Sequence, residues 1–382
     1  MQKNQANFDH LAYVNGKPTN RAVLKALPAD FVVEEQLGYE LKGQGEHLWC
    51  WVEKQGQNTD WVAGQLAKWA NTSKKNVGFA GQKDRHAITR QWFSIHLPGK
   101  VNPDIESFVA DDVKILQSIR HSHKLQRGAL KGNIFEITLR QVEPIDNSNS
   151  SAEIQTQINH RLEQINERGF ANYFGAQRFG HNGNNLSEAS KLFAKRKVSS
   201  NHRTKRKKQS QRNQEGLYIS AVRSWMFNQL LSNRIIQNCW NIPIEGDVLQ
   251  NANGEIVEAQ FDKQDKALLS QVQNGELQPS GLLFGDCKLQ TRSCAYEFEK
   301  KIEDSHPVWM AGLQASRIKS ARRCFQVIPK KLDWCWQDSV DSKKLGLKLN
   351  FELPAGSFAT MLIRELVEVV EPDRNHQANQ KI

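Results

Sequence analysis

The sequence lacks a hydrophobic run long enough to cross a membrane. The chain has 382 residues and a mean hydropathy of −0.64, and its longest apolar stretch covers only Leu48–Val52. A membrane-spanning helix needs about 18 or more consecutive apolar residues, so we expect no integral membrane protein. The polar residues 1–7 are followed by no apolar segment, which predicts neither a signal peptide nor a transit peptide. We therefore expect a cytoplasmic protein.

Cysteine is scarce, and the sequence lacks the common motifs for binding zinc or a nucleotide cofactor. The chain has six cysteines, with no C-x-x-C pair and no histidine at the spacing of a zinc finger. No G-x-x-x-x-G-K-[ST] loop occurs, which excludes a P-loop nucleotide site. We expect reduced thiols, no metal site and no cofactor.

Acidic residues are fewer than basic ones, and the imbalance is local. The chain has 41 Asp and Glu against 52 Lys and Arg, a net charge of +11. Ten of the basic residues lie in residues 189–214, which contain no acidic residue, so the rest of the chain carries about +1. This segment has no apolar residue beyond Val198, which predicts a basic loop that follows a nucleic-acid backbone. The alternative is a solvated linker that only keeps the protein soluble.

Hydrophobic periodicity predicts a mixture of helices and strands. Apolar residues recur at helical spacing in residues 60–70, 151–168 and 218–236, and again from Ser357 to Val369. They alternate with polar residues, as in a half-buried strand, in residues 91–97, 134–139 and 345–353. The pattern predicts an α+β (mixed α/β) fold, and the length favours two domains or one domain with a large insertion.

The segment GFAGQKDRHAIT, residues 78–89, is the strongest candidate for chemistry. Its two glycines, three residues apart, would let the backbone adopt positive φ and approach a ligand. Asp84 stands between Lys83 and Arg85, and flanking cations favour the ionised carboxylate. A carboxylate weakens RNA binding, so nucleophilic or general-base work would explain its presence. The alternative is a turn aspartate that binds backbone amides.

Five blocks of sequence resemble the TruD family of tRNA pseudouridine synthases. The loop at 78–89 is similar to the family's G-x-x-G-x-K-D signature, whose aspartate is the catalytic nucleophile. The other blocks are KALPADFVVEE at 25–35 with GEH at 45–47, KLQRGALKGNIF at 124–135, NYFGAQRFG at 172–180, and PAGSFATMLIREL at 354–366. The blocks occur in family order over most of the chain, so the resemblance is far more specific than a single G-x-x-G.

The resemblance implies an architecture and a reaction. It implies a pseudouridine synthase catalytic core with a mixed, largely antiparallel sheet, formed by residues 1–168 and 328–382. A second α/β (TRUD) domain, residues 169–327 with the basic loop 189–214, would be inserted into it. The implied reaction isomerises uridine, at position 13 in bacterial tRNA, after the base is flipped out of its stack. tRNA is the implied partner, without a cofactor, a membrane or an obligate protein partner.

The resemblance also implies roles for individual residues. Asp84 would be the nucleophile, although attack on the ribose and assistance to its deprotonation both stay open. Asn133 would pair with the uracil edge, and Phe31 and Phe358 would contact the substrate by stacking or by closing the pocket. The residues implied to support the site are Lys25, Lys83, Phe135 and Glu46. Taken without the resemblance, these residues fit plainer roles: a turn asparagine, core phenylalanines, surface lysines and a solvated turn.

Two other functions are kept as alternatives. A non-catalytic RNA-binding or RNA-chaperone protein would share the scaffold, but it would have no need of the complete loop around Asp84. A basic phosphodiesterase would use Asp84 with His86, but this loop offers no second catalytic histidine and no carboxylate cluster.

Overall fold

The protein forms two compact units in the computed structural model, which describes residues 7–126, 128–146, 150–198, 209–251, 253–258, 261–286, 289–338, 345–370 and 372. We call Pro18–Glu167, Pro329–Ala359 and Leu366–Ile382 the sheet unit. We call Met1–Lys17, Arg168–Ile328 and Thr360–Glu365 the helix-rich unit. Each unit is therefore assembled from segments that are distant in the sequence.

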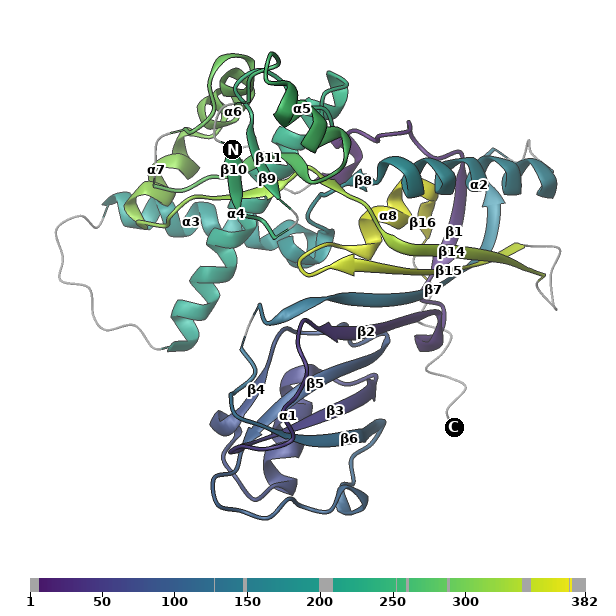
Figure 1. The fold of residues 1–382 in the computed structure, drawn as a ribbon, viewed down its shortest axis with the longest axis vertical. Coiled ribbons are helices and arrows are strands. Elements are labelled where there is room, and N and C mark those ends of the chain that lie inside the picture. Colours follow the sequence, from purple (N-terminus) through teal and green to yellow (C-terminus); the bar gives the residue numbers. More distant parts are fainter. Residues whose placement is uncertain are drawn as a thin grey trace. The chain divides into compact units, whose positions relative to one another are not determined.

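The sheet unit is organised around one large, twisted sheet (Figure 1). Its strands in the described residues are β1 (Asn20–Leu24), β2 (Phe31–Leu37), β3 (His47–Gln55), β4 (Val77–Phe79), β5 (Ile88–His96), β6 (Val113–His121), β7 (Leu130–Pro144), β14 (Lys330–Asp338), β15 (Leu345–Pro354) and β16 (Glu368–Val370). The order is β14-β15-β7-β2-β5-β3-β6, with β1 paired to β7 and β16, and β4 paired to β5. Among these pairs, β1–β16 and β2–β5 are parallel and the others antiparallel. The predicted mixed, largely antiparallel sheet is confirmed.

Two helices cover parts of this sheet. Helix α1 (Thr59–Trp69) follows the predicted apolar stripe and forms one buried cluster with β3 and β5 (Figure 1). Members of that cluster include Val62, Ala63, Leu66, Ala67, Leu48, Cys50, Val52, Phe93 and Ile95. Helix α2 (Ser151–Arg168) matches the predicted range and buries Ile154, Ile158, Leu162 and Ile165. Its Asn159 side chain accepts hydrogen bonds from the indoles of Trp334 and Trp336 on β14, at 2.9 and 3.0 Å.

The helix-rich unit contains two small sheets and most of the remaining helices. The strands are β8 (Phe170–Ala171), β9 (Val248–Asn251), β10 (Ile256–Glu258), β11 (Leu277–Leu283), β12 (Ala321–Cys324) and β13 (Gln326–Val327), and they pair as β10-β9-β11-β12 and β13-β8. The helices are α3 (Asn184–Val198), α4 (Gln209–Ile236), α5 (Lys266–Gln273), α6 (Ser293–Ser305), α7 (Pro307–Ala315) and most of α8 (Ala359–Leu366). In its interior, Arg234 donates two hydrogen bonds to the carboxylate of Asp247, and both side chains are buried.

The structure differs from the sequence predictions in three places. The last helix ends at Leu366, and Val369 lies in β16 because Glu368–Val370 pair with β1. The predicted basic loop is helical in residues 189–198 and 209–214, while residues 199–208 lie outside the described residues. Residues 7–17 group with the helix-rich unit rather than with the sheet, where Arg364 donates hydrogen bonds to the carbonyl oxygens of Phe8, Leu11 and Ala12.

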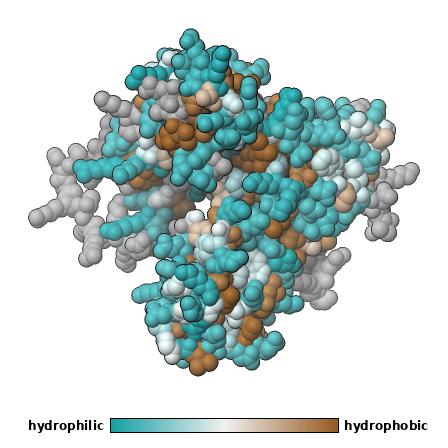
Figure 2. All heavy atoms as spheres, viewed as in Figure 1, coloured by the Kyte–Doolittle hydropathy of each residue, from teal (hydrophilic) through white to brown (hydrophobic). Residues whose placement is uncertain are grey.

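The surface is mainly polar on the face drawn in Figure 2. Hydrophilic residues predominate there, and hydrophobic residues form scattered patches between them. Within the described ranges, every helix is too short or too polar to span a bilayer.

Candidate active site

Asp84 lies in the loop that joins β4 to β5, a strand that pairs with β2 and β3 inside the sheet. Strands β4 and β5 pair so that Gly78 faces Ser94. The prediction that the two glycines of this segment adopt positive φ is wrong, because neither Gly78 nor Gly81 does so. Gly78 is instead required for close packing, since a Cβ there would lie 2.8 Å from the carbonyl oxygen of Leu125. The loop is thus fixed to its neighbours by tight contact.

The carboxylate of Asp84 is partly exposed and held in its ionised form. Its side chain is 36% exposed. Lys25 forms an ion pair with Oδ2, and the backbone N–H of His86 donates to Oδ1 at 2.9 Å. Partial burial raises the pKa of Asp84, but the Lys25 ammonium and the hydrogen bonds outweigh it, so the pKa lies below its ordinary value. The carboxylate of Asp84 is therefore accessible to a ligand and charged at neutral pH.

Lys25 is held over this site by a strained turn. Its φ is +60°, a left-handed conformation that costs a non-glycine residue roughly 1–2 kcal/mol. Its ammonium lies 4.2 Å from the centre of the Phe31 ring, within the range of a cation–π contact. The turn is anchored by buried Asp30, which accepts from the backbone N–H of Leu27 at 2.8 Å and from Arg140 at 2.7–2.9 Å. These contacts set the ammonium opposite Asp84.

Lys83 connects the loop to the middle of the sheet. Its ammonium donates to the amide oxygen of Asn133 on β7 at 2.5 Å and lies 3.1 Å from Oε1 of Glu35 on β2. Glu35 is buried and also accepts from the backbone N–H of Trp92 at 3.1 Å. Burial raises the pKa of Glu35, although Lys83 opposes the effect. Because Lys83 binds the oxygen of Asn133, the two donors of its NH₂ group are the part of that amide left to bind a ligand.

Lys54, on β3, supports the loop from beneath. Its side chain is 0% exposed, and its ammonium donates to the backbone carbonyl of Asp84 at 2.9 Å. Burial lowers the pKa of Lys54 to about 8, an effect that Asp84 opposes and Lys83 strengthens. Thr89 is its cross-strand neighbour on β5, and the buried Thr89 hydroxyl has no hydrogen-bond partner among the described residues. A fully buried cation thus donates to the backbone of the residue that carries the candidate nucleophile.

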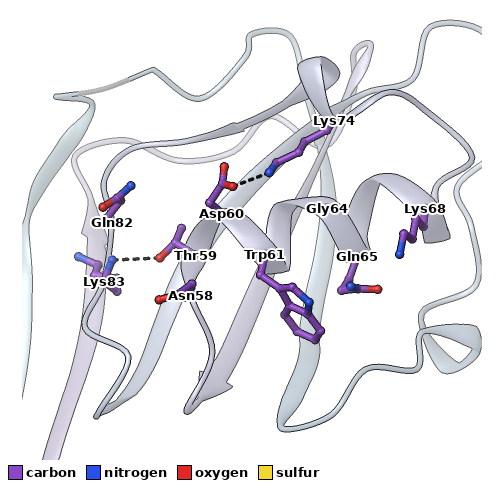
Figure 3. Close-up of a pocket in the computed structure, with 10 residues that line it drawn as sticks. All are labelled: Asn58, Thr59, Asp60, Trp61, Gly64, Gln65, Lys68, Lys74, Gln82 and Lys83. Carbon is purple, nitrogen blue, oxygen red and sulfur yellow. Dashed lines mark hydrogen bonds and ion pairs between the residues drawn. The ribbon is translucent and has the colours of Figure 1, made fainter. Parts of the chain in front are cut away.

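A second polar link joins the loop to α1. The backbone N–H of Lys83 donates to the Thr59 hydroxyl oxygen at 3.0 Å, drawn as a dashed line in Figure 3. The Thr59 hydroxyl in turn donates to Gln91 on β5 at 3.1 Å. Gln91 donates to the carbonyl of Gly81 at 3.3 Å. The start of α1 and the middle of β5 therefore fix the loop from two sides.

The structure brings some of the predicted site residues together around Asp84, and it places Glu46 apart from them. Lys25, Lys83 and Asn133 all belong to the contacts around Asp84 described above. Glu46 does not, because it contacts His96 at 3.4 Å. His96 lies at one end of the β3–β5 ladder, and Gln55 pairs with Ile88 at the other end.

The three predicted phenylalanines are placed differently from one another. Phe31 and Phe135 are buried, and their rings meet edge to face at 6.3 Å. Phe135 also stacks on Phe351. Phe358 is half-buried and lies just after β15, before α8 begins. A role in the hydrophobic core would also bury the rings of Phe31 and Phe135, so their burial does not distinguish that role from a contact with the substrate.

Sequence reasoning missed Lys54 and left Glu35 without a role. Lys54 follows Leu48, Cys50 and Val52 on the inward face of β3. A charged residue at an inward position was the one feature of the sequence that could have pointed to it. The described residues contain no group of three His, Cys, Asp or Glu side chains placed to hold a metal ion.

Comparison with known proteins gives a consistent set of similarities. The chain matches the family model described as tRNA pseudouridine synthase D (TruD) over residues 7–204 and 200–366. It is 45% identical over 366 residues to tRNA pseudouridine synthase D of Hydrogenovibrio crunogenus, covering 96% of this chain and 98% of the relative. It is 41% identical over 374 residues to the protein of that name from Vibrio cholerae, covering 96% and 94%. The crystal structure of a putative tRNA pseudouridine synthase D (TruD) from Methanosarcina mazei shares the fold, with a TM-score of 0.69, 21% identity, and coverage of 93% and 95%.

Proposed function

The chain belongs to the TruD family of tRNA pseudouridine synthases, enzymes that isomerise uridine in RNA, and we propose that it converts uridine 13 of tRNA to pseudouridine with Asp84 as nucleophile. In this reaction the N1–C1′ bond breaks, the uracil turns, and a C5–C1′ bond forms. The proton leaves C5 and a proton is gained at N1. The reaction is an isomerisation, so it consumes no electrons and no high-energy donor.

The observation that carries the proposal is the state of Asp84. Its carboxylate is ionised, partly exposed, and paired with the Lys25 ammonium. Attack at the ribose needs the charged form, and the ammonium keeps it charged across the neutral pH range. Each carboxylate oxygen has more than one lone pair, so the contacts to Lys25 and His86 leave acceptor capacity for the reacting carbon. The pairing also fixes the direction of the carboxylate.

We propose that the uridine reaches Asp84 by base flipping. A uridine stacked in an RNA helix does not present its ribose and both uracil edges to one carboxylate, and extrusion costs only a few kcal/mol. Asn133 then pairs with the uracil edge through its NH₂ group, since Lys83 holds its oxygen. Phe31 and Phe135 form the apolar wall behind Lys25, and Phe358 contributes a half-buried ring near the end of β15.

Lys54 acts in this proposal as a positioning residue. It touches the backbone of Asp84 through the carbonyl and contacts no reacting atom. A charged hydrogen bond in a buried site fixes the Asp84 peptide more firmly than a neutral one would. The direction of the carboxylate toward the ribose then depends on a cation beneath the loop as well as on Lys25 beside it.

The test uses purified protein and unmodified tRNA, with pseudouridine mapped at single-nucleotide resolution. The wild-type chain is expected to form one pseudouridine, at position 13, without added metal or nucleotide. Asp84→Asn is expected to form none, because an amide is not a nucleophile. Asp304→Asn is the matched control, since that exposed carboxylate lies on α6. Product at another position would refute the assignment to uridine 13, and undiminished product with Asp84→Asn would refute the nucleophile.

Tight tRNA binding without any product would favour the non-catalytic alternative. For this comparison the same preparations are titrated with tRNA at several salt concentrations. The basic segment is tested at the same time by neutralising Lys205–Lys208, four charges that lie outside the described residues. If the segment follows the RNA backbone, the slope of log affinity against log salt falls by roughly one unit for each phosphate that the variant no longer binds. An unchanged slope would make the segment a linker.

A further inference from the structure

An open pocket lies beside the Asp84 loop, on the side where α1 begins (Figure 3). Its volume is about 510 Å³. Residues from α1 and its N-terminal flank form one wall, Lys74 contributes at the rim, and Gln82 and Lys83 of the loop form the other wall. Since these two loop residues directly precede Asp84, the pocket shares a wall with the candidate active site.

Trp61 is the unusual feature of this pocket. It projects from the same side of α1 as Gln65 and Lys68, at helical spacing (Figure 3), and it is 38% exposed. Trp69, on the same helix, donates its indole N–H to Ser107 and packs edge to face on Phe108. In contrast, among the described residues the Trp61 ring makes no aromatic or cation–π contact, and its indole N–H makes no hydrogen bond. The ring is therefore available as a stacking surface.

The polar groups around Trp61 match a nucleotide better than a peptide or an apolar ligand. Lys68 is exposed and forms no ion pair within the described part of the chain, so its charge is free for a phosphate. The carboxylate of Asp60 is already neutralised by Lys74 at 2.5 Å. The amides of Gln65 and Gln82 offer both donors and acceptors to a base edge. A stacking ring, one free cation and two amides are the groups that recognise an unpaired nucleotide.

We propose that this pocket binds one unpaired nucleotide of the RNA substrate, next in the chain to the uridine that enters the active site. Its base stacks on Trp61 and its phosphate pairs with Lys68. The inference rests on the proposed function, because the pocket is placed next to the target uridine only through Gln82 and Lys83, which line it and directly precede Asp84. A base held there would keep the neighbouring uridine out of its stack.

Photochemical cross-linking tests the pocket without requiring turnover. Asp84→Asn protein is mixed with tRNAs that each carry one 5-iodouridine at a position near the target, then irradiated and analysed by mass spectrometry. We expect a cross-link from a flanking position to the peptide that contains Trp61. The cross-link should disappear in a Trp61→Ala variant of the same protein and persist with Trp61→Phe. Cross-links that reach other peptides and never this one would overturn the proposal.

Kinetics of the otherwise wild-type chain give an independent readout. Loss of one base–aromatic stack is expected to raise the KM for tRNA roughly 5- to 100-fold in Trp61→Ala, and Trp61→Phe should recover most of the affinity. Lys68→Ala should lower the salt slope by about one unit, whereas Lys114→Ala, an exposed lysine on β6, should not. An unchanged KM in Trp61→Ala, in protein that still forms pseudouridine, would overturn the pocket assignment and leave the proposed function standing.

Discussion

Replacing Lys54 by methionine should slow the reaction without unfolding the protein. Methionine has a similar length and removes only the ammonium, which donates at 2.9 Å to the carbonyl of Asp84. The side chain is 0% exposed, so no water replaces the missing donor unless the structure opens. The Asp84 peptide then loses the hydrogen bond that sets its direction, while the carboxylate keeps its ion pair with Lys25.

The size of the effect follows from the kind of bond that is removed. A hydrogen bond to a charged group contributes about 1.5–3 kcal/mol, which corresponds to roughly 10- to 100-fold in rate if the bond is fully used in the transition state. The effect should fall on kcat, because Lys54 is buried and touches no RNA. A change in KM alone would indicate that the substitution had altered the RNA-binding surface instead.

The pH dependence distinguishes this role from a purely structural one. Burial lowers the pKa of Lys54 from 10.5 to about 8, so about nine-tenths of the side chains are charged at pH 7 and about one-tenth at pH 9. Wild-type kcat should therefore decline with an apparent pKa near 8. In Lys54→Met this decline should vanish, and Lys54→Gln, whose amide donates without titrating, should recover part of the rate without restoring the decline.

Stability should change with pH in the direction opposite to activity. Between pH 8 and 10.5 the unfolded chain keeps the proton of Lys54 while the folded chain has released it, so the free energy of unfolding rises with pH in that window. Single-turnover pseudouridine formation and thermal unfolding, both measured from pH 6 to pH 9.5, test the two trends. Wild-type kcat and an unchanged decline near pH 8 in Lys54→Met would refute the reasoning.

Three further substitutions test other contacts. Lys25→Met removes the cation that lowers the pKa of Asp84, so the acidic limb of kcat/KM should move to higher pH; a limb that stays in place would show that Lys25 does not set this ionisation. Asn133→Ala should lower single-turnover kcat/KM roughly 10- to 100-fold by removing the proposed uracil contact, and wild-type kinetics would refute that role. Asp247→Asn leaves Arg234 buried without a countercharge and should cost about 3–5 kcal/mol in urea unfolding, against little change for the exposed Asp304→Asn.

Local patterns in the sequence predicted both long helices of the sheet unit and three of its strands, β5, β7 and β15. The apolar spacing of residues 151–168 corresponds to α2, and the alternation in 345–353 corresponds to β15. The final segment was mispredicted because Val369 fits a helical stripe, while its actual place depends on pairing with β1, at the other end of the chain. No periodicity within the segment carries that information.

The candidate site was partly visible in the sequence, for similar reasons. Asp84 could be proposed from its loop, since a carboxylate between two cations is unusual in a basic RNA-binding context. Lys54 could not, because its meaning depends on a contact with a carbonyl 30 residues away and on complete burial. Glu46 was expected near the site because it falls within a family block, but the β3–β5 register carries it to the far end of the strands. Whether a residue at the start of β3 lies near the Asp84 loop therefore depends on how β3 pairs with β5, which the sequence does not reveal.

At position 25, the backbone conformation and the ion pair with Asp84 favour different residues. A glycine would occupy φ of +60° without the steric cost that a lysine bears, so the turn itself favours a residue with no side chain. The carboxylate of Asp84 favours a long side chain with a positive charge. A library varied at position 25 and screened for resistance to heat would therefore not enrich lysine, whereas one screened for modified tRNA would.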